Sequence, residues 1–505
     1  MPKKYILEIT VFVSGGLVMV YEIIGSRILA PFIGTSTYIW TSLIGVILGA
    51  LSLGYWIGGR TADRNPELKI LSLVIFLAGG LVSATTLIKD VVLSFIASAQ
   101  MPLEIKSLIA AAVLFAPASV ALGFVTPYAV KLKTVSLADS GKTVGSLFAF
   151  STVGSIVGTF AAGFFLIPFV GSVRTLYIIS GGLIVLGLLL VPFTISRTTV
   201  AAIIVFILGI AASEFSVAEL RAANDLYDID TQYSRVRVFQ TVDPRNNKPI
   251  TALATDPYFT QSAIYLDSDD RVLEYSRFYS LASYYKPELK KALMIGGAGY
   301  TFPQEFLRTH PDATIDVAEI DPGMTEIAKR FFRLKDDPRM KISHADGRVF
   351  LNAGEADKYD VVFVDACNSL FSVPYQITTR EAVREISRVL KPDGVVLFNL
   401  VGSSIRGSAS QFLQAEFLTY AHVFPVVDLY KVNLGFPDER VQNLIIAASK
   451  DGRQPPPSTG PEIAELLSHR YPEPFSLDAA ALTDDLAPVE YYNSIALNFY
   501  SRERR

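Results

Sequence analysis

The sequence is poor in cysteine, histidine and net charge. It has one cysteine, Cys367, in 505 residues, which excludes an intrachain disulfide framework and a cysteine-cluster metal site and fits a reducing compartment. The four histidines are scattered without the spacing of metal ligands, so we expect no metal site. The formal net charge of -3 is small for this length and does not indicate a polyanionic partner such as a nucleic acid.

Charged residues are also sparse across residues 1–217, although 18% of the whole chain is charged. Seven apolar stretches in this half approach the ~20 residues that cross a bilayer. They cover residues 6–29, 38–57, 70–88, 103–125, 146–169, 176–193 and 200–215. The sequence therefore predicts a multi-span transmembrane domain at 1–217 and a multi-pass protein of the cell membrane.

The remainder has the composition of a globular protein. Residues 233–239, 250–254 and 262–266 read as short strands between Pro, Asn and Asp clusters, which predicts a β-hairpin subdomain over 223–285. From 286 to 505, apolar strands at 292–295, 314–318, 341–343, 359–364 and 395–400 alternate with helical stretches such as 323–332 and 380–390. That alternation predicts a Rossmann-like, doubly wound parallel sheet with a C-terminal tail.

Glycines and acids follow four of these strands. The segments are Gly296-Gly297-Ala298-Gly299, Glu319-Ile320-Asp321, Asp346-Gly347 and Asp365. Ligands of a parallel sheet bind outside the carboxyl ends of its strands, so we expect all four segments to border one crevice.

Each segment suits one part of a nucleoside ligand. The glycines let the backbone turn tightly and approach the ligand. Glu319 follows Gly299 by roughly twenty residues, the offset at which a carboxylate accepts hydrogen bonds from ribose hydroxyls. Asp346-Gly347 suits an adenine amino group, and Asp365 would point into the crevice where chemistry occurs. The sequence thus predicts a nucleoside-dependent enzyme, with a helix cap as the structural alternative for Asp365.

Over residues 231–401 these motifs resemble the spermidine synthase (polyamine aminopropyltransferase) family, in the form that carries an N-terminal multi-span membrane domain. The resemblance implies transfer of a propylamine group from decarboxylated S-adenosylmethionine to an amine such as putrescine, with release of methylthioadenosine and without a bound cofactor. Asp365 would be the general base, assisted by Tyr275 or Tyr279. The residues implied on the amine side are Tyr233, Ser234, Gln261, Tyr275 and Asn368.

The amine side also departs from the family pattern. Gly299 stands where the family has an aspartate, Asn368 where it has a second acid, and Ser234 where it has a glutamine. Acids in the tail, Asp484 and Asp485, would restore negative potential if the tail folded over the crevice. The nucleoside side looks retained, whereas putrescine as the acceptor is in doubt.

Two other functions stay open at this point. One is an S-adenosylmethionine-dependent methyltransferase, although Met294 and Ile295 stand where an acid usually precedes the glycine loop. The other is a transporter with a nucleoside- or polyamine-sensing domain. Expected partners are the bilayer, the adenosyl sulfonium, a small amine and a second copy of the chain. Basic residues in every second loop favour a cytoplasmic N-terminus, and the cosubstrate favours a cytoplasmic catalytic domain.

Overall fold

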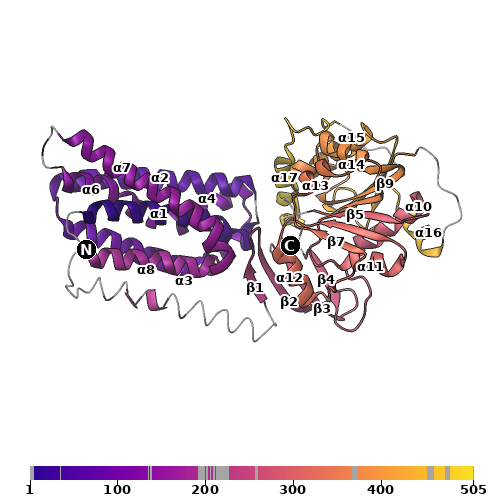
Figure 1. Ribbon diagram of the computed structural model, residues 1–505, viewed down its shortest axis with the longest axis horizontal. Coiled ribbons are helices and arrows are strands. Elements are labelled where there is room, and N and C mark those ends of the chain that lie inside the picture. Colours follow the sequence, from indigo (N-terminus) through magenta and orange to yellow (C-terminus); the bar gives the residue numbers. More distant parts are fainter. Residues whose placement is uncertain are drawn as a thin grey trace. The chain divides into compact units, whose positions relative to one another are not determined.

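The structure is a computed structural model. It describes residues 5–34, 36–134, 136, 139–190, 200, 203–204, 206–208, 211, 227–255, 260–366, 373–451, 460–472 and 478–503. These residues form two compact units (Figure 1). One comprises residues 1–223 and 229–235, and the other comprises 224–228 and 236–505. The expected domain boundary at 217–223 lies outside the described residues.

The first unit is helical. Its elements are α1 (Ile6–Ile33), α2 (Thr37–Arg64), α3 (Leu68–Ser98), α4 (Leu103–Leu114), α5 (Ala116–Gly123), α6 (Val125–Lys133), α7 (Ser140–Ala161), the π-helix η2 (Ala162–Val170) and α8 (Ser172–Leu190). Within the described residues, five helices are long and apolar enough to cross a membrane, or six if one bent pair counts as a span. The expected seventh stretch, 200–215, lies largely outside the described residues.

The fourth apolar stretch is not the single span that its composition predicts. The chain bends by 52° between Leu103–Leu114 and Ala116–Lys133. Pro117 lacks an N–H and clashes with the preceding turn, so the helix cannot continue straight through it. Hydroxyls of Tyr21 and Thr85 donate to the carbonyl oxygen of Leu114 at the break, each at 2.9 Å.

Glycines bring α1 and α7 into close contact. A Cβ on Gly154 would lie 2.0 Å from the carbonyl oxygen of Phe12, and one on Gly158 would lie 2.2 Å from that of Gly16. No larger residue fits at either position without moving a backbone. The small-residue face of α7 therefore serves helix packing.

After the helices the chain forms a small sheet, in which β1 (Tyr227–Asp230), β2 (Arg235–Val242), β3 (Pro249–Ala254) and β4 (Ser262–Tyr265) are neighbours in that order. β2, β3 and β4 pair antiparallel, as the expected hairpin requires. β1 is an additional strand that the sequence pattern did not indicate.

The larger sheet has seven strands in the order β10-β11-β9-β8-β5-β6-β7. Their bounds are β5 (Lys291–Ile295), β6 (Thr314–Ala318), β7 (Met340–Ser343), β8 (Tyr359–Val364), β9 (Leu390–Ser403), β10 (Val426–Lys431) and β11 (Gln442–Ser449). The five strands β5 to β9 run parallel, whereas β11 pairs antiparallel with both β9 and β10. The expectation of a purely parallel sheet is corrected at this edge, because a loop rather than a crossover helix joins β10 to β11.

Helices cover both faces of this sheet, so it is doubly wound. Alternate residues of β5 and β8 enter two separate cores. One core contains residues of η3 (Glu274–Leu281), α11 (Thr301–Thr309), α12 (Pro322–Phe331) and α16 (Pro461–Ser468). The other contains residues of α13 (Gly347–Ala353), α14 (Arg380–Val389), α15 (Gln411–Ala421) and α17 (Val489–Glu503). The short α10 (Ala282–Tyr285) follows η3. The expected Rossmann-like fold is confirmed.

Candidate functional site

The glycine loop after β5 lies directly against the end of β8. Gly296 has a φ of +93°, and a Cβ there would lie 2.3 Å from the carbonyl oxygen of Asp365. Ala298 and Tyr300 also have positive φ values, of 42° and 55°. Backbone conformations of this kind persist only where the surroundings hold them, and they cluster at ligand-binding sites.

The Glu319 side chain binds the backbone of this loop through hydrogen bonds. Its Oε2 accepts hydrogen bonds from the backbone N–H groups of Gly297 at 2.7 Å and Ala298 at 3.1 Å, and its Oε1 accepts one from Asp321 at 2.8 Å. Burial raises the pKa of the Glu319 carboxyl, and these three donors oppose that shift. The carboxylate therefore fixes the loop, and its remaining acceptor capacity is what a ribose would use.

Asp346 lies at the carboxyl end of the neighbouring strand, β7. Its Oδ1 accepts from the N–H groups of Arg348 at 2.8 Å and Val349 at 3.1 Å, which caps α13. A Cβ on Gly347 would lie 2.6 Å from a methyl group of Ile295, so glycine lets α13 pack against β5. The structure thus gives both residues a packing or capping role in addition to the adenine contact that we expect.

Asp365 follows β8, whose six residues are all buried. Its Oδ2 accepts a hydrogen bond from the Tyr275 hydroxyl at 3.0 Å, and its Oδ1 accepts one from the Asn399 amide at 2.8 Å. Burial raises the pKa of Asp365, whereas hydrogen bonds from Asn399, Tyr275 and Tyr279 lower it. A carboxyl with a raised pKa and fixed orientation is suited to accepting a proton.

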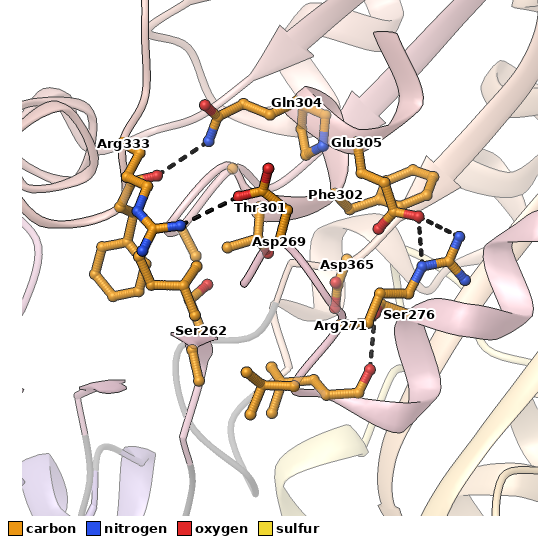
Figure 2. Close-up of a pocket in the computed structure, with 18 of the residues that line it drawn as sticks. Ser262, Asp269, Arg271, Ser276, Thr301, Phe302, Gln304, Glu305, Arg333 and Asp365 are labelled. Carbon is orange, nitrogen blue, oxygen red and sulfur yellow. Dashed lines mark hydrogen bonds and ion pairs between the residues drawn. The ribbon is translucent and has the colours of Figure 1, made fainter. Parts of the chain in front are cut away.

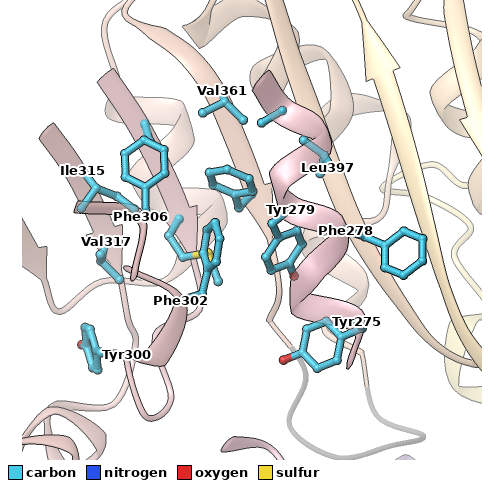
Figure 3. Packing of buried hydrophobic residues seen from close by; sticks show 14 of the residues in the cluster. Tyr275, Phe278, Tyr279, Tyr300, Phe302, Phe306, Ile315, Val317, Val361 and Leu397 are labelled. Carbon is cyan, nitrogen blue, oxygen red and sulfur yellow. The ribbon is translucent and has the colours of Figure 1, made fainter. Parts of the chain in front are cut away.

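Tyr275 and Tyr279 reach this position from η3. Tyr279 packs in the core beneath the site, with ring centroids 4.7 Å from Phe302 and 5.1 Å from Phe363 (Figure 3). The two tyrosine rings are 6.0 Å apart in an edge-to-face arrangement. An aromatic core therefore orients the helix that supplies the hydroxyl donor to Asp365.

A cavity of about 330 Å³ opens beside Asp365 (Figure 2). Of the residues expected from the sequence, it is lined by Gln261, Tyr275, Gly296, Gly297 and Asp365. Glu319 and Asp346 lie at the ends of β6 and β7, farther along the same sheet edge. The structure thus brings the proposed base together with two amine-side candidates.

The other amine-side candidates are placed differently. Tyr233 and Ser234 lie in a turn in which the N–H groups of both residues donate to Thr231 Oγ1. By its contacts this turn belongs to the first unit. Asn368 lies outside the described residues.

The departure at position 299 has a steric cause. A Cβ on Gly299 would lie 2.7 Å from Ser262 Cβ and 3.0 Å from the ring of Phe332. The Gly299 N–H also donates to Ser262 Oγ at 3.0 Å, which ties β4 to the glycine loop. The chain therefore has no room for the family's aspartate at this position.

We expect Gly299→Asp to destabilise the fold rather than to restore an amine-binding acid. Overpacking of this kind typically costs about 1–3 kcal/mol, so the melting temperature of the full chain should fall by several degrees. The matched control is Gly435→Asp, in an exposed loop where only the side-chain oxygen of Asn433 comes near a Cβ. An unchanged melting temperature in Gly299→Asp would contradict this steric account.

Sequence reasoning missed three features of the site, namely Asn399, Ser262 and the charged loop at 266–271. Asn399 lies on β9 and reaches Asp365 across 34 positions of sequence. Among the described residues, no group of three His, Cys, Asp or Glu side chains could hold a metal ion.

The segment that carries this geometry matches a known protein family. Residues 274–434, which include the glycine loop, Glu319, Asp346 and Asp365, match the spermine/spermidine synthase domain. This segment of the chain belongs to the spermine/spermidine synthase family. The match begins with η3 and extends through β10, so it includes Tyr275, Asp365 and Asn399 but not Gln261, Ser262 or the loop at 266–271.

Three curated relatives show how far the similarity extends. A polyamine aminopropyltransferase of Vibrio vulnificus is 25% identical over 295 residues, which are 55% of this chain and 93% of that protein. Polyamine aminopropyltransferase 1 of Streptomyces coelicolor is 23% identical over 78% of this chain and 75% of its own length. That share exceeds the soluble part, so the similarity reaches into the apolar half. Putrescine N-methyltransferase 2 of Nicotiana tabacum is 32% identical over 115 residues, covering 22% of this chain and 32% of that protein.

Proposed function

We propose that this protein is a membrane-bound aminopropyltransferase that moves a propylamine group from decarboxylated S-adenosylmethionine to an amine. The observation that carries the proposal is the placement of Asp365, which lies beside the glycine loop with its carboxylate oriented by Tyr275 and Asn399. Membership of the spermidine synthase family supports the same reaction class. The apolar helices of the first unit support attachment to a membrane. The need for a cytoplasmic cosubstrate favours a catalytic part on the cytoplasmic side.

The reaction would be a displacement at the propyl carbon next to the sulfonium. The neutral amine forms the new C–N bond as the C–S bond breaks, and the bonding pair stays on sulfur, so neutral methylthioadenosine leaves. The attacking nitrogen becomes cationic and gives its proton to Asp365, which lines the cavity. Glycine loop and cavity together hold donor and amine in line, which is the main contribution that positioning makes to such a reaction.

The test uses the full chain in detergent. Calorimetric titration with decarboxylated S-adenosylmethionine, S-adenosylmethionine and methylthioadenosine measures binding, and mass spectrometry identifies products with a panel of amines. We expect methylthioadenosine and an aminopropylated amine. A nucleoside that binds without any release of methylthioadenosine would contradict the proposal.

Methyl transfer is a second candidate, and the similarity to a putrescine N-methyltransferase favours it. The same assay separates the two reactions, because methyl transfer requires S-adenosylmethionine and yields S-adenosylhomocysteine. Formation of that product with a methylated amine would replace the aminopropyltransferase assignment.

The proposed base gives the reaction a predictable pH dependence. Asp365 acts deprotonated, and its pKa is raised by burial, so kcat/KM should fall as the pH drops through a value above that of an ordinary aspartate. Tyr275→Phe removes a hydrogen bond that favours the charged form, so the acidic limb should move to higher pH by about one unit. The control is Tyr491→Phe, a tyrosine that is 54% exposed on α17. A limb that stays in place in Tyr275→Phe would show that Asp365 does not control it.

A further inference from the structure

Besides Asp365, seven charged side chains among the described residues line the cavity. We call these seven side chains the rim. Four of them are bases, namely Arg271, Arg308, Arg333 and Lys335. Three are acids, namely Asp269, Asp270 and Glu305. The rim has a formal excess of one positive charge, and the carboxylate of Asp365 balances it, so the described lining has no net charge.

Most of these charges are paired (Figure 2). The Asp269 carboxylate is shared by Arg308 at 3.3 Å and Arg333 at 3.1 Å, and Glu305 pairs with Arg271. These pairs fix the loop at 266–271, because Arg333 also donates to the carbonyl oxygens of Tyr265 and Leu266. These ion pairs stabilise the loop, so they do not by themselves indicate a bound ligand.

Two rim charges are left over. Within the described residues Lys335 has no ion pair, and the Asp270 carboxylate accepts only from Ser268 Oγ at 3.0 Å and makes no ion pair. The loop does not need Lys335 for its anchoring. Lys335 is exposed at the rim, where a charged group on an entering substrate would meet it.

A second cavity of about 490 Å³ shares Tyr275 with the first. Its ionisable lining is also balanced, with the acids Asp243 and Glu274 and the bases Arg245 and Arg440. Arg245 pairs with both of these acids. Among the described residues, neither cavity next to the proposed base therefore offers the acidic surplus that a dication would require.

This distribution restricts the acceptor. The donor already brings a sulfonium and an ammonium group, and a diamine would bring further positive charge into a site whose described lining has no net negative charge. Like charges in a partly dehydrated cleft repel one another. An acceptor whose remote end carries a carboxylate beside an ammonium group adds no net positive charge there, and it offers a partner to Lys335 as well as to Asp270.

We propose that the acceptor is an amine bearing a carboxylate, of the amino-acid type, and that Lys335 is a specificity-determining residue that meets this carboxylate at the rim. The inference rests on the aminopropyltransferase function proposed above. The inference also explains why glycine and asparagine, rather than acids, occupy positions 299 and 368. An acceptor with a carboxylate needs less negative charge around it than a diamine does.

The test compares acceptors that differ only by a carboxylate. Full-length protein in detergent is assayed for methylthioadenosine release with ornithine against 1,4-diaminobutane, and with lysine against 1,5-diaminopentane. We expect a higher kcat/KM for the carboxylated member of each pair. Lys335→Glu should shift that ratio toward the diamine by on the order of 10-fold, because an attraction at an exposed site is replaced by a repulsion.

Lys290→Glu is the matched control, because Lys290 is an exposed lysine paired with Glu288 and does not line the cavity. It should leave the ratio unchanged. Preference of the wild type for the diamines, or an unchanged ratio in Lys335→Glu, would overturn the inference and leave the proposed function standing. Nucleoside binding without release for any amine would overturn the proposed function and the inference with it.

Discussion

Asp365→Asn should lower turnover by on the order of 10²-fold or more while leaving nucleoside affinity nearly intact. Asparagine keeps the size of the side chain and can still accept the hydrogen bond from Tyr275. It cannot take up the proton that an attacking amine must lose. The measurement is methylthioadenosine release under saturating donor, together with calorimetric titration of the nucleoside.

Asp484→Asn provides the control for this variant. Asp484 is a tail acid that accepts from Thr379 Oγ1 and pairs with Arg348, and it does not line the cavity. Its replacement should leave turnover and amine KM unchanged. Wild-type turnover in Asp365→Asn would remove Asp365 from the mechanism, and a loss confined to nucleoside binding would make it a ligand contact.

The fold of the soluble half was largely predictable because its signals are local. Each central strand is a short apolar run followed by a glycine or an acid, and β5, β6 and β8 begin and end within one residue of the expected positions. The carboxyl-end rule then placed Glu319, Asp346 and Asp365 on one edge of the sheet. A residue's position relative to the end of its strand was sufficient for these predictions.

Contacts between distant segments were not predictable in this way. Ser262 fills the space beside Gly299, and Asn399 binds Asp365, but neither lies in a pattern that indicates its partner. The loop at 266–271 reads from sequence only as a polar turn. That its charges face the same cavity as Asp365 depends on how the small sheet packs against η3 and α11.

The edge of the sheet and the fourth apolar stretch show the same limit. Periodicity identifies a strand but not its partner, so the insertion of β11 between β9 and β10 could not be deduced. Composition marked residues 103–125 as one span, although Pro117 is a local signal for the break that the structure shows. The sequence also left open whether the tail acids lie over the crevice, and the structure pairs one of them, Asp484, with Arg348 of α13.

Glu319→Gln should weaken nucleoside binding by roughly 1 to 3 kcal/mol, because charge-assisted hydrogen bonds are lost. The structure predicts a second effect of the same substitution, on the stability of the free protein. A carboxylate offers two acceptor oxygens, and both are used by backbone N–H groups: Oε2 by Gly297 and Ala298 of the glycine loop, and Oε1 by Asp321. Glutamine offers one acceptor oxygen and one NH2 group, so at least one of those N–H groups would face a donor.

The loss of binding should therefore come with a lower melting temperature of the free protein. A residue that only contacts the ribose would affect binding alone. The control is Glu326→Gln on the exposed face of α12, which should change neither quantity. Calorimetric titration with methylthioadenosine and a thermal melt of the ligand-free chain measure the two effects. If Glu319→Gln weakened binding with an unchanged melting temperature, the carboxylate would be a ribose contact that the loop does not need. If neither quantity changed, Glu319 would have no part in nucleoside recognition.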